Sequence, residues 1–129
     1  MSDFIFSERS KNNLVGVHND LGTLAHQALK LSTVDFCITE GLRTIEQQKL
    51  LVKQGKSQTL NSRHLSGHAI DVFAYPDASG SWDFAYYEMI ADAFKKASVI
   101  TKLPIEWGGD WKTFKDGAHF QLPWRDYPL

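Results

Sequence analysis

Apolar residues recur at intervals of three and four in two stretches of the chain, and this spacing predicts helices. The first stretch begins at Asn19 or Asp20 as a helix cap, and its apolar positions are Leu21, Leu24, Ala28 and Leu31. The second covers roughly residues 84–100, and its apolar positions are Phe84, Tyr87, Ile90, Ala91, Phe94 and Ala97. Each stretch therefore offers one apolar face to a core.

A third helix is predicted by its end signals. Thr44 can cap the first turn, and Gln47, three residues later, completes a capping-box arrangement. Lys53 suits the negative end of the helix dipole, and Gly55 follows as a stop. We expect a helix over residues 44–53, followed by residues 56–66 with no usable periodicity.

Strand signals occupy other stretches of the chain. Residues 35–39 are apolar and rich in β-branched side chains, and residues 69–75 alternate small, β-branched and aromatic side chains before Pro76. Two shorter apolar pieces, residues 105–107 and 119–122, flank a glycine-containing loop. The mixture predicts an α+β fold, with a small, mainly antiparallel sheet flanked by about three helices.

One residue stands out in the predicted strand at residues 69–75. Side chains alternate between the two faces of a strand, so Asp71 lies on the face opposite Ile70 and Val72. A carboxylate on a mainly apolar strand is costly to bury without a partner. A metal ion or a basic side chain would remove that cost.

Composition agrees with a single domain and narrows the function. A chain of 129 residues can bury a core without disulfides, and no repeat or linker divides it, so we expect one domain over residues 1–129. Cys37 is expected to be a buried, unpaired thiol. A net charge of -1 and a pI near 6.5 argue against a nucleic-acid partner. The sequence shows neither a secretory signal pattern nor an apolar run of membrane-spanning length, so we expect no membrane insertion.

Two histidines and an aspartate form a candidate metal site. His64 and Asp71 lie in a segment of small residues with Gly67 as a turn-permitting residue, and His119 follows later. Two imidazoles and one carboxylate are three ligands for tetrahedral zinc, with a fourth position open for water. Asp116, three residues before His119, can accept a proton from that water. The set predicts hydrolytic chemistry.

The other histidines fit a metal site less well. A single histidine is usually an ordinary polar residue, and His18, before a helix cap, and His26, within a helix, have no feature that changes this expectation. His68 is four residues after His64 and would lie beside it on a helix. Gly67 and the strand-like residues that follow disfavour a helix there.

Two motifs carry a resemblance to a known family. They are Ser62-x-His64-x-x-Gly67-x-Ala69-x-Asp71 and Asp116-x-x-His119-Phe120. Together they resemble the zinc DD-peptidase and L-alanyl-D-glutamate peptidase family, which includes bacteriophage endolysins and bacterial cell-wall hydrolases. The resemblance extends through residues 16–21, 41–44, 47–48 and 106–111, and the Trp-Gly-Gly-Asp-Trp segment points to the L-alanyl-D-glutamate endopeptidase branch. It implies a hedgehog/DD-peptidase-like fold.

The resemblance also implies roles for individual residues. It makes His64, Asp71 and His119 the zinc ligands and Asp116 the general base. It makes Arg43 a cationic donor to the oxyanion that develops on the substrate, although without the resemblance Arg43 reads as a surface arginine near a helix start.

Weaker candidates for substrate contacts are Ser62, Gln48, Trp107 and Asp110. For Ser62 and Asp110 a loop cap is an equal alternative. Trp107 and Trp111 could wall a peptide cleft, and core packing is the alternative for at least one of them.

These implications converge on a zinc endopeptidase that hydrolyses the L-alanyl-D-glutamate bond of peptidoglycan stem peptides, acting as a monomeric phage endolysin without a wall-binding domain. We expect synthesis in the host cytoplasm without a signal peptide, and action on the wall in the periplasm after holin-type release. Two alternatives stay open: a D-alanyl-D-alanine carboxypeptidase with the same metal chemistry, and a noncatalytic zinc-binding module of the hedgehog type.

Overall fold

The computed structural model describes residues 3–57, 59–113 and 115–128. In chain order its elements are α1 (Glu8–Asn13), α2 (Asn19–Leu31), β1 (Asp35–Glu40), α3 (Ile45–Lys53), β2 (Ala69–Tyr75), α4 (Phe84–Thr101), β3 (Glu106–Trp107) and β4 (His119–Gln121). Two short 3-10 helices, η1 (Arg63–Ser66) and η2 (Gly108–Asp110), lie between them. The predicted α+β class is confirmed.

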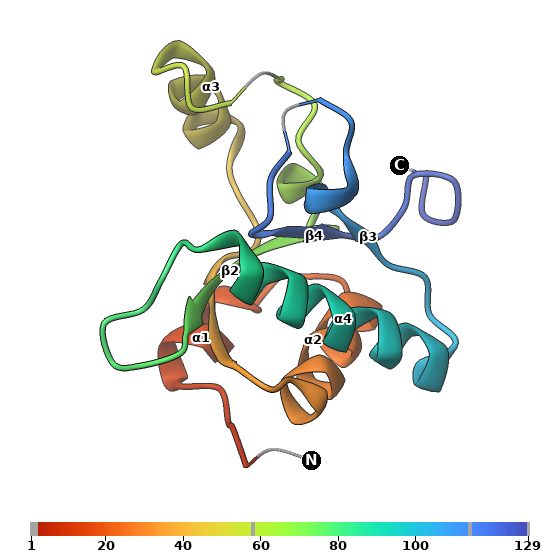
Figure 1. The fold of residues 1–129 in the computed structure, drawn as a ribbon. Coiled ribbons are helices and arrows are strands. Elements are labelled where there is room, and N and C mark those ends of the chain that lie inside the picture. Colours follow the sequence, from red (N-terminus) through yellow and green to blue (C-terminus); the bar gives the residue numbers. More distant parts are fainter. Residues whose placement is uncertain (1–2, 58, 114, 129) are drawn as a thin grey trace.

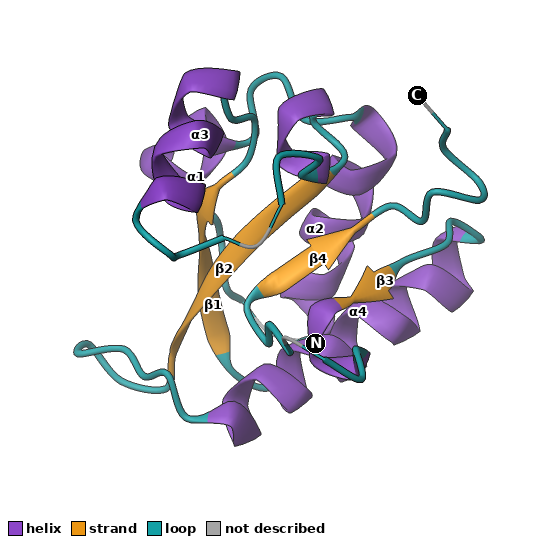
Figure 2. Cartoon of the chain, turned by 90° about the horizontal axis from the view of Figure 1, so that it is seen from above, coloured by secondary structure: helices purple, strands orange, loops and turns teal. Residues whose placement is uncertain are grey.

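The four strands form one antiparallel sheet in the order β1-β2-β4-β3. Figure 1 shows α2 and α4 on one side of this sheet, and α3 with the loops around η1 and η2 on the other. Figure 2 shows the sheet from above, with the long strands β1 and β2 next to each other and the short strands β4 and β3 following on the side of β2. The two sides of the sheet therefore have different environments.

The core lies between the sheet and the pair α2 and α4. The strands contribute Ile38, Ile70, Val72 and Phe120, all fully buried, and Phe120 stacks on Phe94 of α4 with a ring separation of 4.1 Å. Burial of such side chains is the main favourable term in folding. The alternation expected for β2 is confirmed, because Ile70 and Val72 face this core while Asp71 faces away from it.

Several details of the helices differ from the prediction. The helix α1 was not expected, and its one buried residue is Ser10, whose hydroxyl accepts a hydrogen bond from the backbone N–H of Ile38. His18, rather than Asn19 or Asp20, caps α2, because its Nδ1 accepts from the N–H of Asp20 at 3.0 Å. The helix α1 has no apolar stripe that would predict it from the sequence. A tertiary contact holds it in place.

Among the remaining expectations, one helix start is confirmed and two predicted burials are wrong. The capping box of Thr44 and Gln47 at the start of α3 is confirmed. Phe84, expected in the buried stripe of α4, is 42 % exposed, and Cys37 is only partly buried, so these two expectations of burial were wrong. No helix in the described part of the chain is both long enough and apolar enough to cross a membrane.

Candidate metal centre

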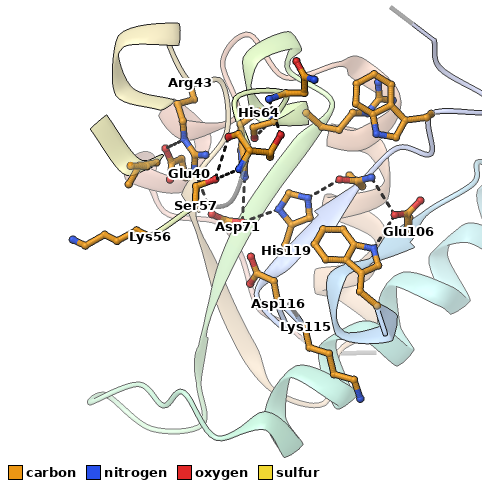
Figure 3. Close-up of a pocket in the computed structure, with 18 residues that line it drawn as sticks. Glu40, Arg43, Lys56, Ser57, His64, Asp71, Glu106, Lys115, Asp116 and His119 are labelled. Carbon is orange, nitrogen blue, oxygen red and sulfur yellow. Dashed lines mark hydrogen bonds and ion pairs between the residues drawn. The ribbon is translucent and has the colours of Figure 1, made fainter. Parts of the chain in front are cut away.

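The pairing of β2 with β4 creates the centre of the candidate site. In this ladder Asp71 lies directly opposite His119, although 48 residues separate them in the sequence. Directly opposed residues of antiparallel strands carry their side chains on the same face. That face is the one turned away from the core, so both side chains point into the pocket drawn in Figure 3.

His64 completes the set from the 3-10 helix η1. Its Nε2 lies 3.2 Å from Oδ1 of Asp71, and Nδ1 of His119 lies 3.3 Å from the same oxygen. One candidate ligand atom from each of the three residues lies within 4.8 Å of the other two. Figure 3 shows the three side chains pointing toward one another. Within the described residues this is the one such group of histidine, cysteine and carboxylate side chains. The predicted ligands therefore converge.

The local sequence explains how His64 reaches this place. The hydroxyl of Ser62 caps η1 by accepting from the N–H of His64, and Gly67 ends it with a φ of +76°. That left-handed backbone favours glycine. A Cβ on Gly67 would also lie 2.4 Å from the backbone oxygen of Gly16, a distance no side chain tolerates. The expected need for a glycine beside His64 is confirmed.

Both imidazole rings are anchored at the nitrogen that faces away from Asp71. The outer nitrogen of each ring has its own partner: Nδ1 of His64 lies 2.8 Å from the carbonyl oxygen of Gly41, and Nε2 of His119 lies 2.7 Å from Oε1 of Gln121. A ligating histidine usually donates its second N–H in this way, which leaves the other nitrogen free to bind the ion. The two nitrogens that face Asp71 are the ones the site would use.

The electrostatics support an ionised aspartate at the centre. Burial alone would raise the pKa of Asp71, but hydrogen bonds from His119 and His64, and their charges, hold it far below its ordinary value. Burial would lower the pKa of His119, but the hydrogen bond and charge of Asp71 outweigh it, so the pKa of His119 is raised. Asp71 is therefore a carboxylate that already attracts positive charge.

Asp116 faces the three ligands from the turn that leads into β4. Its side chain lines the pocket (Figure 3), and its backbone N–H donates to the oxygen of Gly108 at 3.0 Å. A Cβ on Gly108 would lie 2.4 Å from the backbone oxygen of Asp116, so this glycine allows the two loops to touch. Desolvation by the surrounding pocket and the negative charge of Asp71 raise the pKa of Asp116. A carboxylate with a raised pKa is a better proton acceptor.

Arg43 is a buried part of the pocket wall and not a surface arginine. Its Nε donates to Oε1 of Glu40 and its Nη1 to Oε1 of Gln48, both at 2.6 Å. The third nitrogen, Nη2, lies 3.8 Å from Oδ2 of Asp71. A β-bulge in β1, between Ile38 and Glu40, brings Glu40 opposite Asp71. The guanidinium is thus held in one orientation beside the ligands.

The weaker candidates separate into two groups. Ser62 and Trp111 line the pocket. Gln48 is fully buried behind Arg43, Trp107 packs beside Phe120 in the core, and Asp110 is exposed on the surface. These last three are not among the residues that line the pocket.

The pocket, about 760 Å³ in volume, also contains residues that sequence reasoning did not single out. They include Lys56, Arg63, Glu106, Lys115, Gln121 and Trp124. Gln121 could have been found, because it lies two residues after His119 on a predicted strand and so shares its face. Glu106 had no such signal, since it reaches the site only through strand pairing.

Comparisons with known proteins agree with this geometry. Residues 1–121 match the family model described as phage L-alanyl-D-glutamate peptidase. The chain is 31% identical to the L-alanyl-D-glutamate peptidase of Escherichia phage T5, over 88% of the chain and 85% of the relative. It is 37% identical to the peptidoglycan L-alanyl-D-glutamate endopeptidase CwlK of Bacillus subtilis, over 69% of the chain and 61% of the relative.

A second phage protein and a solved structure extend the comparison. The L-alanyl-D-glutamate peptidase of Listeria phage A118 is 34% identical over 98% of the chain, which spans 45% of that relative. The crystal structure of the Serratia marcescens L-Ala D-Glu endopeptidase ChiX matches with a TM-score of 0.91 and 49% identity, covering 98% of this chain and 96% of that one. The likeness therefore includes both the fold and the sequence.

Proposed function

The chain belongs to the phage L-alanyl-D-glutamate peptidase family, and we propose that it is a zinc endopeptidase that cleaves the L-alanyl-D-glutamate bond of peptidoglycan stem peptides. The observation that carries this proposal is the convergence of His64, Asp71 and His119 on one point, with Asp116 beside them. Proteins that are 31% to 49% identical to the chain are named for that bond.

The donor set supports zinc as the metal. Two neutral imidazole nitrogens and one carboxylate oxygen are typical ligands of catalytic zinc, and both rings are already anchored by their outer nitrogens. Zinc in such a site supplies a Lewis acid that polarises a carbonyl and makes water more acidic. His64, Asp71 and His119 would hold it.

Asp116 is the proposed general base. It lines the same pocket as the three candidate ligands, is not one of them, and has a raised pKa. In the proposed reaction it takes a proton from the attacking water and returns it to the departing nitrogen of D-glutamate. The same carboxylate therefore serves both halves of the hydrolysis.

Arg43 is the proposed donor to the oxyanion that forms on the L-alanyl carbonyl. Glu40 and Gln48 bind two of its nitrogens, which fixes the direction of the third toward the site. A fixed cation stabilises developing negative charge without first having to reorient. Gln48 accepts a hydrogen bond from Arg43, and the hydroxyl of Ser62 accepts one from the backbone N–H of His64, so we propose that these two residues support the site from behind.

The partner is peptidoglycan, and the catalytic unit is proposed to be a single domain that works as a monomer. Two of the relatives are phage proteins, which supports a role in host lysis. We propose that the wall is reached from the cytoplasm through a holin-type pore.

The direct test is mass spectrometry of the products that the zinc-loaded protein releases from purified muropeptides. We expect the stem peptide to be released with D-glutamate at its new amino terminus. Release of free D-alanine alone would identify a D-alanyl-D-alanine carboxypeptidase. Zinc binding with no cleavage of any muropeptide would identify a noncatalytic module.

A further inference from the structure

The imidazole of His119 is held at both of its nitrogens. It is buried, with Nδ1 facing Asp71 and Nε2 lying 2.7 Å from Oε1 of Gln121. A neutral histidine that binds a metal through Nδ1 must carry its proton on Nε2. Gln121 favours that form only if its amide presents the oxygen, and not the NH₂ group, to the ring.

The orientation of the Gln121 amide is set by Glu106. Nε2 of Gln121 donates to Oε2 of Glu106 at 3.1 Å, and the indole N–H of Trp111 donates to the same oxygen at 2.9 Å. A carboxylate only accepts hydrogen bonds, and an indole only donates. If the amide were reversed, its oxygen would face the Glu106 carboxylate, so the observed orientation is the favoured one.

Strand pairing places these groups in line. Glu106 of β3 is opposite Gln121 of β4, and His119 lies two residues before Gln121 on the same face of β4. The hydrogen bonds therefore run in one direction, from His119 through Gln121 to Glu106. All three residues and Trp111 line the pocket. Figure 3 labels Glu106 and His119 among them.

We propose that Glu106, acting through Gln121, is a positioning residue that favours the tautomer of His119 with the proton on Nε2 and so raises the affinity of the metal site. The inference rests on the metal site of the proposed function, but it concerns neither the substrate nor the bond cleaved. The anchor is negatively charged and lies one side chain away from the ligand. An amide between them orients the ring without placing a carboxylate against it.

The test replaces the carboxylate with a group of the same shape, in the variant Glu106→Gln. The new amide can present either its oxygen or its NH₂ group to Gln121, so the orientation of Gln121 is no longer fixed. Long-range nitrogen–proton NMR of the metal-free protein, at a pH where His119 is neutral, reports its tautomer. Because the carboxylate of Asp71 competes for the ring proton at Nδ1, we expect the fraction of His119 that carries its proton on Nε2 to be lower in the variant than in the parent protein.

Zinc affinity, measured by competition with a chelator, gives a second readout. Loss of such a supporting hydrogen bond weakens metal binding by about 10- to 100-fold in other proteins, and we expect a loss in that range for Glu106→Gln. The matched control is Glu88→Gln, an exposed glutamate of α4 outside the site, which should leave affinity unchanged. A thermal melt of each metal-free variant checks that the fold is kept.

The outcomes separate this inference from the proposed function. An unchanged tautomer fraction and parental zinc affinity in Glu106→Gln would overturn the positioning role, even if the enzyme cleaves muropeptides as proposed. A lower fraction of Nε2-protonated His119, together with weakened zinc binding, would support it, even if the parent protein proves to cleave a different bond.

Discussion

Replacing Gln48 with leucine tests how the helix α3 is attached to the site. Gln48 is the one buried residue of α3, and its side chain is fully buried. Its Oε1 accepts from Arg43, while its Nε2 donates to the hydroxyl of Ser57 and the carbonyl of Thr59. Leucine has a similar volume, so Gln48→Leu removes these hydrogen bonds with little cavity formation.

Most of the expected loss of stability comes from the hydrogen bond that Arg43 loses. In the variant its buried Nη1 has lost its acceptor, and an unsatisfied buried group costs about 1–3 kcal/mol, with charged groups at or above the upper end. Thr59 is exposed, so its carbonyl can bind water instead. We therefore expect a loss of about 2–3 kcal/mol in the free energy that holds α3 in place.

The loss should be local. Since the rest of α3 buries little, the helix can detach without opening the core. Hydrogen exchange followed by mass spectrometry should show amide exchange in α3 accelerated by about 30- to 150-fold, the equivalent of 2–3 kcal/mol. Amides of β2 and α4 should keep their protection.

The matched control is Lys49→Ala, which changes an exposed neighbour on the same helix. It should leave exchange in α3 nearly unchanged. Unchanged exchange in Gln48→Leu, or an equal loss of protection in α4, would refute the idea that one buried amide anchors this helix.

Three further predictions concern the reaction, the metal and the core. Asp116→Asn should retain zinc but lower kcat for muropeptide cleavage by about 10²- to 10⁴-fold, and near-parental kcat would remove Asp116 as the base. Because protonation of His119 competes with metal binding and its pKa is raised, chelator competition should show zinc affinity falling about tenfold per pH unit as pH drops below that pKa. Tyr87→Phe removes the hydroxyl that accepts from the N–H of Ala74 and donates to the carbonyl of Ser81. Urea unfolding should show a loss of about 1–3 kcal/mol in the free energy of unfolding, and an unchanged midpoint would contradict this.

The elements that the sequence predicted well are those whose signals are local. Thr44 and Gln47 satisfy each other's backbone groups within one turn, so the start of α3 could be placed from four residues. The alternation in β2 placed Asp71 on the face opposite Ile70 and Val72, because side chains of any strand alternate. Motif spacing and family resemblance then supplied the roles proposed for the ligands.

The parts that could not be predicted depend on which segments meet. The helix α1 is held by the Ser10–Ile38 hydrogen bond between residues 28 positions apart, and no apolar stripe announces it. Gln48 was expected to contact substrate, but the structure places it behind Arg43. Neither result follows from the spacing of residues within one segment.

The sequence by itself determined which residue types are available for the site. It also determined which face of each strand carries them, because side-chain alternation within a strand depends only on positions a few residues apart. Only the tertiary structure decided that β2 pairs with β4, which sets Asp71 opposite His119, and that β3 pairs with β4, which sets Glu106 opposite Gln121. Register between distant strands is fixed by the packing of their apolar faces on a shared core, and that packing exists only once the whole chain has folded.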